Sequence, residues 1–206
     1  MQKIINSGSD GNCEIYFGCI AVDMGVNFKK IAPYLKDLKI ILLTHLHGDH
    51  LNIETLKKIC FERPSIRIAC GIHLAEILQG FKNVDYCMAG ELYDYGRFQI
   101  RPIIAYHDVQ NFGWRIFKDG KKVFRVTDTQ HLEGIEAKNY DLYAIESNYN
   151  EDTVFESITQ ADNEGRFSHK RGAINSHLSE QQCNEFFFKN KGDHSILSRL
   201  HQSKTP

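Results

Sequence analysis

The segment THLHGDH, residues 44–50, concentrates side chains that can bind metal ions. It follows the apolar run KIILL, which predicts a buried strand. His45 therefore begins the loop at the carboxyl end of that strand. In an extended segment His45 and His47 can point the same way, because side chains alternate with period two. Asp49 and His50 then open a predicted helix, where free amides favour a carboxylate. Two pairs of ligands in two directions suit two neighbouring cations; the alternative is a solvated strand end.

Three more candidate ligands stand where predicted strands stop. His107 follows RPIIAY, Asp128 follows KVFRVT, and His201 follows HSILSRL. Because α/β proteins place their sites at one edge of the sheet, these residues can meet there. A lone histidine after a strand is usually only a polar strand end, but three such residues added to the first cluster favour a metal site. Four other histidines have no comparable pattern and are left out: His73, His131, His169 and His194.

The composition predicts one globular domain over residues 1–206, with 42% hydrophobic and 25% charged residues. Short β-like runs fill both halves, and Asp119-Gly120 between two alternating runs predicts a hairpin. Helical periodicity covers 28–35, 51–60, 72–79, 151–158 and 178–189, and in the last of these the aromatic run 186–188 is read as core packing. This mixture predicts an α/β protein with two sheets packed together and helices outside.

The net charge and the cysteines indicate which partners and which cellular compartment to expect. The net charge of −1 gives no global basic field for nucleic acid, although a local patch would suffice. No apolar run approaches the roughly 20 residues of a membrane span, and the start of the chain lacks a secretion signal. Six scattered cysteines without a C-x-x-C pair indicate reduced thiols, and hence a cytoplasmic protein.

The order and spacing of these residues resemble the metallo-β-lactamase superfamily over nearly the whole chain. AVDMG, THLHGDH, His107, VTDT and LHQS correspond to its successive motifs. The resemblance implies a four-layer αββα sandwich, in which Asp23 supports the metal loop without binding metal. It also implies the ligands of two metal ions: His45, His47 and His107 for one, Asp49, His50 and His201 for the other, with Asp128 bridging both.

Within the superfamily, SGSDGNC, DLYAIESNYN and AINSHLSEQQCNEFF resemble segments of the small YycJ-type exonucleases. SHLSEQQ is also similar to the catalytic histidine loop of tRNase Z, which implies that His177 donates a proton. Its alternative is a surface histidine beside a helix cap. Asp49 is grouped with His177 as catalytic. Nearby, Lys170 and Arg171 suit phosphate contacts, unless they belong to a solvated turn.

Histidine and carboxylate ligands suit two divalent ions, zinc first, with manganese or iron as alternatives. Such a pair can share a hydroxide whose pKa falls from 15.7 towards about 7. The pattern H-x-H-x-D, rather than the H-x-E-x-D that resembles redox di-iron proteins, favours hydrolysis. SGSDGNC lacks the G-K-[ST] ending of a P-loop, so its glycines are expected to form a tight turn at the edge of the metal site.

The leading hypothesis is a metal-dependent phosphodiesterase or nuclease that acts on nucleic acid, because the branch resemblance and His177 point to it. Hydrolysis of a small ester, thioester or lactone is the alternative, favoured by the near-neutral charge. A non-catalytic scaffold is the third reading, and the complete set of seven ligands speaks against it. The sequence leaves the substrate and the oligomeric state open.

Overall fold

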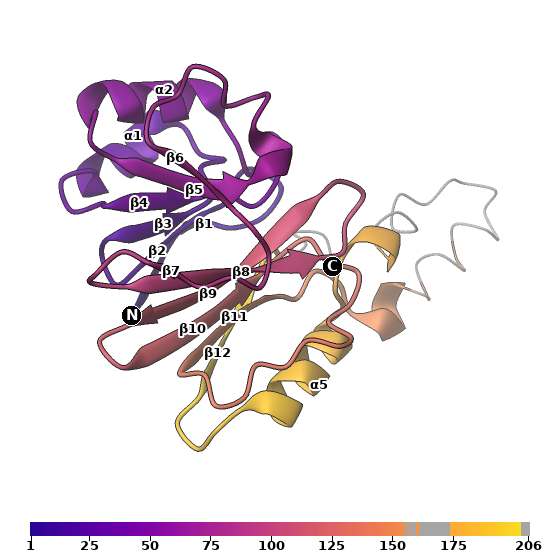
Figure 1. Ribbon diagram of the computed structural model, residues 1–206. Coiled ribbons are helices and arrows are strands. Elements are labelled where there is room, and N and C mark those ends of the chain that lie inside the picture. Colours follow the sequence, from indigo (N-terminus) through magenta and orange to yellow (C-terminus); the bar gives the residue numbers. More distant parts are fainter. Residues whose placement is uncertain (155, 157–159, 161–173, 203–206) are drawn as a thin grey trace. The chain divides into compact units, whose positions relative to one another are not determined.

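The computed structural model describes all residues except 155, 157–159, 161–173 and 203–206 (Figure 1). The chain divides into two compact units, residues 1–103 and 104–206. One domain over 1–206 therefore stays a prediction. Within the described part, no helix is long and apolar enough to cross a bilayer. All six cysteines lie there, and each is a free thiol.

The first unit contains a six-stranded sheet in the order β1-β2-β3-β4-β5-β6. Its strands are β1 (Gln2–Asn6), β2 (Cys13–Tyr16), β3 (Ile20–Val22), β4 (Ile40–Leu42), β5 (Arg67–Gly71) and β6 (Val84–Cys87). The first three strands pair antiparallel, and β3 to β6 pair in parallel. In the parallel part Val22 faces Leu42, which faces Ala69, so these strands end at one edge.

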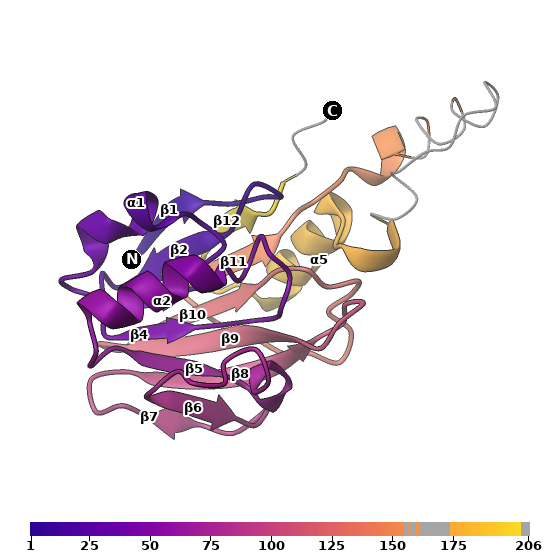
Figure 2. The same ribbon diagram turned by 90° about the horizontal axis from the view of Figure 1, so that it is seen from above.

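Helices cover one face of this sheet. They are α1 (Phe28–Ile31), η1 (Ala32–Tyr34), α2 (Ile53–Glu62) and the single turn η2 (Ile72–Leu74), and Figures 1 and 2 show α1 and α2 on the same face. Leu56 and Ile59 of α2 are fully buried with Ile41 and Ile68 of the sheet, because spacings of three and four residues place apolar side chains on one helical face. The helix predicted over 72–79 is only the turn η2.

The start of α2 corrects one expectation. Its N-cap is Asn52, whose side chain accepts a hydrogen bond from Thr55 N. Asp49 lies three residues earlier, in a turn that His50 N and Leu51 N close on the carbonyl of His47. Asp49 is therefore not at the amino terminus of the helix. The turn takes up the residues that were assigned to the first helical turn.

The second sheet has the order β12-β11-β10-β9-β8-β7. Its strands are β7 (Tyr93–Asp94), β8 (Gln99–Ala105), β9 (Asn111–Lys118), β10 (Lys121–Val126), β11 (Leu142–Glu146) and β12 (Ile196–Leu200). The hairpin predicted at Asp119-Gly120 is confirmed, and both residues have positive φ, as its tight turn requires. β10, β11 and β12 are parallel, with Val126 opposite Ile145 and Glu146 opposite Leu200.

The helix α5 (Glu180–Asn190) packs on this sheet in the second unit. Ser179 caps it in a reciprocal arrangement with Gln182. The ring of Phe186 stacks on Phe124 at 5.2 Å, and Phe187 meets Tyr143 edge-on at 5.4 Å. Core packing is confirmed for these two phenylalanines, whereas Phe188 is exposed. The helix predicted over 151–158 lies partly outside the described residues.

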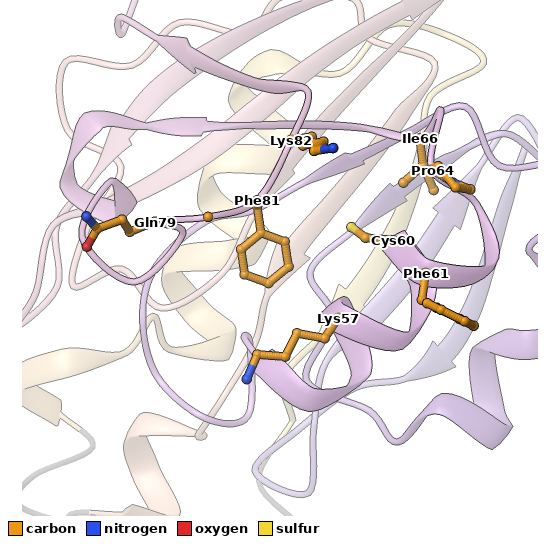
Figure 3. A pocket seen from close by; sticks show the side chains of 9 residues that line it. Lys57, Cys60, Phe61, Pro64, Ile66, Gln79, Phe81 and Lys82 are labelled. Atoms are coloured by element: carbon orange, nitrogen blue, oxygen red, sulfur yellow. The ribbon is translucent and has the colours of Figure 1, made fainter.

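A pocket of about 560 Å³ opens in the first unit between the end of α2 and the segment before β6 (Figure 3). Cys60, Phe61 and Phe81 line it together with Ile66, which directly precedes β5. The pocket thus lies at the amino ends of the parallel strands. The histidine loop follows β4 at the opposite, carboxyl edge, where parallel sheets place their chemistry.

Candidate functional site

The histidine loop of the first unit brings three imidazole rings together. The ring of His45 lies 4.8 Å from that of His47 and 4.2 Å from that of His50, centroid to centroid. His45 and His50 are buried, and His47 is half-buried. The carbonyl of His47 accepts a hydrogen bond from His50 N at 2.9 Å, so the chain turns back after His47. This turn adds His50 to the pair expected from strand alternation.

Asp23 supports the histidine loop through hydrogen bonds to Thr44 and His50. Its Oδ1 accepts hydrogen bonds from the backbone and hydroxyl of Thr44 at 3.0 and 2.8 Å, and its Oδ2 accepts from His50 Nδ1 at 2.7 Å. Asp23 is fully buried, so these contacts compensate for the loss of water around its charge. The carboxylate therefore fixes both ends of the loop.

Asn12 joins the glycine-rich segment to the loop. Its Nδ2 lies 3.2 Å from Asp49 Oδ2 and 2.9 Å from His50 Nε2, and its backbone N donates to Asp49 O at 2.6 Å. Its Oδ1 accepts from Gly8 N at 2.8 Å. The tight turn expected for SGSDGNC is present, because Gly11 N donates to Gly8 O at 2.9 Å. The turn thus delivers a buried amide to the two polar residues that end the loop.

Gly25 allows the close backbone approach that holds this arrangement together. A Cβ at Gly25 would lie 1.7 Å from Asp49 O, and a Cβ at Gly11 would lie 2.3 Å from Gly25 O. No side chain larger than hydrogen fits at either contact. Gly48, within the loop itself, has nothing within 4 Å of such a Cβ.

His73 supports the loop from a second direction. Its Nε2 donates to the carbonyl of Thr44 at 3.0 Å, directly before His45. Burial lowers the pKa of His73, and the hydrogen bond to Thr44 only partly opposes that effect. A neutral imidazole therefore holds the start of the loop.

A second set of donors gathers at the carboxyl ends of the parallel strands in the second unit. Asp128 lies two residues after β10, Glu146 ends β11, and His201 directly follows β12. These residues and His177 each offer a ligand atom, and the four atoms lie within 4.8 Å of one another. The parallel register explains this, because the three strands stop together at one edge.

Glu146 organises this set, although it was not among the residues predicted from the sequence. Its Oε1 lies 2.6 Å from His177 Nδ1 and 3.1 Å from His201 Nδ1. Its Oε2 accepts from the backbone N of Thr129 at 3.0 Å and of Leu178 at 3.1 Å. Burial raises the pKa of Glu146, but the hydrogen bonds from both histidines outweigh it and lower the pKa. Each oxygen of this buried carboxylate therefore has two partners: the two histidine rings at Oε1 and the two backbone N–H groups at Oε2.

His177 stands at the head of the segment that leads into α5. Its Nδ1 also lies 3.4 Å from Asp128 Oδ1. Burial lowers its pKa, but the hydrogen bond to Glu146 and the charges of Glu146 and Asp128 outweigh burial and raise it. The Glu146 contact occupies Nδ1 and orients the ring, so Nε2 is the other nitrogen that can carry or give a proton. The role of His177 in proton transfer stays a prediction.

His107 approaches the same segment. Its Nδ1 donates to Ser176 O at 3.1 Å, its Nε2 lies 3.1 Å from Asp108 Oδ1, and its ring centroid is 5.6 Å from that of His177. Burial lowers the pKa of His107 more than the charges of Asp128 and Asp108 raise it. Lys170 and Arg171, the candidate phosphate contacts, lie outside the described residues.

The tail carrying His201 is tied down. Asn148 Nδ2 donates to His201 O at 3.0 Å, and Ser147 N donates to Leu200 O at 3.0 Å. His201 is buried, with 6% of its surface exposed. Its φ is +50°, and Asp23 and Asp128 have φ of +59° and +52°. Positive φ strains residues other than glycine, so the surrounding contacts hold all three in place.

Four of the predicted ligands share one hydrogen-bonding pattern. Nδ1 contacts Thr44 Oγ1 in His45, a carboxylate in His50 and His201, and a carbonyl in His107. In His45, His50 and His201 this contact favours the tautomer in which Nε2 carries the lone pair, the arrangement typical of metal-binding histidines. In His107 the Asp108 carboxylate, 3.1 Å from Nε2, favours a proton on that nitrogen instead. The imidazole and carboxylate donors fit zinc by their chemistry.

One of the supporting residues, Glu146, could have been predicted from the sequence. Glu146 ends the apolar run LYAIE, and a carboxylate at the end of a buried strand must have partners. Asn12 and His73 could not, because their contacts join segments far apart in the chain.

Comparison with known proteins agrees with this architecture. The model of the beta-lactamase superfamily domain matches residues 23–177, more than half of the chain. Among solved structures, the metallo-beta-lactamase fold protein YhfI from Bacillus subtilis is 16% identical, with a TM-score of 0.75 over 100% of this chain and 87% of that one. The short form of human tRNase Z is 15% identical, with a TM-score of 0.69 over 98% and 93% of the two chains.

A diphosphatase of the PhnP family is 14% identical, with a TM-score of 0.65 over 98% of this chain and 85% of that one. No curated protein matches the chain. The chain belongs to the beta-lactamase superfamily and has the metallo-β-lactamase fold, so the αββα fold class expected from the sequence is confirmed. His201 lies beyond the matched residues 23–177.

Proposed function

We propose that this protein is a metal-dependent phosphodiesterase that acts on nucleic acid. The loop donors and the strand-end donors together hold two divalent ions, zinc first and manganese or iron as alternatives: His45, His47 and His107 at one, Asp49, His50 and His201 at the other, and Asp128 at both. When bound, the ions supply Lewis acidity and an activated hydroxide. The proposal requires residues 1–206 to act as one domain. Family membership and the common Nδ1 pattern of the histidines support it.

The contact between Glu146 and His177 is the observation that favours phosphodiester hydrolysis over the other reactions of the superfamily. His177 Nδ1 is held at 2.6 Å by a carboxylate, so Nε2 is the end that can give a proton. The alkoxide that leaves a phosphodiester needs a proton, and a positioned imidazole is a common general acid. Asp23 and Asn12 keep the loop in place, and Asp49 is both a ligand and a candidate catalytic carboxylate. The names of two similar structures, a tRNase Z and a diphosphatase, agree with phosphorus chemistry.

The test compares three substrates with metal-loaded protein: single-stranded DNA, a nitrophenyl phosphodiester and a thioester. We expect cleavage of both phosphodiesters, and a loss of both activities after chelation and their return with zinc. A protein that hydrolyses only the thioester would favour the alternative.

That alternative is an ester, thioester or lactone hydrolase of the same superfamily. The net charge of −1 favours it, because a nucleic-acid enzyme commonly carries a basic surface. In a thioester the leaving thiolate needs less help from an acid, so the His177–Glu146 pair would contribute little. The effect of removing His177 therefore separates the two functions.

A further inference from the structure

An aromatic pair lies beside the strand-end donors and has no role in the proposed chemistry. The rings of Tyr106 and His131 stack with centroids 4.2 Å apart and an angle of 24° between their planes. Although His131 covers one face of its ring, 43% of Tyr106 is exposed. Exposed aromatic rings are the surfaces on which unpaired nucleobases stack in proteins that bind single strands.

Hydrogen bonds fix both members of the pair. The hydroxyl of Thr129 accepts from Tyr106 N and donates to His131 O, each at 2.9 Å. Gln130 N also donates to Tyr106 O at 2.8 Å. One threonine thus holds the backbone of both ring-bearing residues. A surface that is ordered in advance loses little conformational entropy when a ligand stacks on it.

The same threonine connects the pair to the chemistry. Thr129 N donates to Glu146 Oε2 at 3.0 Å, and the other oxygen of Glu146 holds His177. Tyr106 directly precedes His107, and Thr129 directly follows Asp128. Two hydrogen bonds, both made by Thr129, therefore connect the aromatic pair to the carboxylate that orients the candidate acid.

The surface beside the pair is hollowed. His131 lines a hollow of about 190 Å³, and Leu178, which follows His177, lines it as well. One member of the ring pair, His131, and the residue that follows the candidate acid thus line one open region of the second unit.

We propose that Tyr106 is the residue on which a base of single-stranded nucleic acid stacks, next to the phosphodiester that is cleaved. This inference rests on the proposed function and specifies its substrate class. It distinguishes nucleic acid from a small phosphodiester without a base, because only a nucleotide benefits from the stack.

The experiment uses metal-loaded protein and two strands of the same length, oligothymidylate and a strand with abasic tetrahydrofuran at every position. Wild type should cleave oligothymidylate with a kcat/KM roughly ten- to a hundredfold higher. Tyr106→Leu should bring the two strands to the same kcat/KM, and Tyr106→Phe should keep the preference because the ring remains. Tyr86→Leu is the matched control, since Tyr86 is 42% exposed on β6 in the other unit.

Equal cleavage of both strands by wild type would overturn the stacking role and leave the phosphodiesterase standing. A base preference that survives in Tyr106→Leu would also overturn it, and thermal unfolding would then show whether the ring serves only packing. Cleavage of neither strand would overturn the proposed function. In that case, fluorescence anisotropy with the same two strands still decides whether Tyr106 binds bases.

Discussion

Glu146 holds His177 through a 2.6 Å contact between Oε1 and Nδ1, while the other oxygen of the carboxylate accepts two backbone N–H groups. A fully buried charge with four hydrogen-bonding partners is a positioning device rather than a solvated acid. The contact gives the imidazole one orientation. It also connects the segment before α5 to the end of β11.

His177→Ala is expected to slow cleavage of an alkoxide-leaving phosphodiester by roughly 10² to 10⁴, the usual range for general acid catalysis. The loss should shrink with a nitrophenolate leaving group, which departs without a proton. Metal content should stay unchanged. Equal losses on both substrates would exclude the acid role, and loss of a metal would make His177 a ligand.

Asp128→Ala is expected to harm both metal positions, because a bridging carboxylate serves two ions. Elemental analysis of wild type purified without chelator should approach two equivalents of transition metal per chain. The variant should bind less than one. Full activity of chelated, metal-free wild type would contradict the dinuclear site.

Truncation after Leu200 is expected to lower metal occupancy at the second position, because it removes His201. Removal of residues 203–206 alone is the control, since it leaves His201 and its contacts with Glu146 and Asn148 intact. Occupancy is measured by elemental analysis and by competition with a colorimetric chelator. If both truncations retain two metals, His201 is an ordinary tail residue.

Gly25→Ala is expected to displace the backbone of Asp49, because the new Cβ would lie 1.7 Å from Asp49 O. We expect weaker metal binding and a loss of roughly 1–3 kcal/mol in stability, the range for overpacking. Gly48→Ala is the matched control, since that Cβ meets nothing within 4 Å. Chelator competition and urea unfolding measure both effects. Identical behaviour of the two variants would show that the contact is dispensable.

His73 is expected to contribute a pH dependence to stability. Burial lowers its pKa in the folded state, so protonation favours unfolding. Its contribution is complete above the unfolded value of about 6.5 and is lost as the pH falls through the folded pKa. His73→Gln can still donate to Thr44 O and does not titrate. Urea unfolding with chelator should therefore show wild type losing stability relative to His73→Gln between about pH 7.5 and 5.5. Parallel curves would contradict this assignment.

The sequence by itself determined the features that depend on local pattern. Alternation and apolar runs predicted the strands, and Asp119-Gly120 predicted the hairpin, because turn geometry is set by adjacent residues. The motif THLHGDH and the polar residues that follow the later apolar runs also predicted where several of the strands end. These residues stand where expected, at the ends of β4, β8, β10 and β12. Their joint binding of two metals stays a prediction.

Only the tertiary structure decided which residues hold those side chains. Glu146 meets His177 because the register of β11 against β10 and β12 brings three strand ends together, and register is not written in any single strand. Asn12 reaches Asp49 across a contact that only Gly25 permits. The prediction that Asp49 opens the helix was wrong for the same reason. Asp49 lies in a turn closed by backbone hydrogen bonds, and these hydrogen bonds outweigh the local preference of a carboxylate for a helix terminus. Periodicity reports neighbours along the chain, whereas supporting contacts join residues that meet only after the strands have paired.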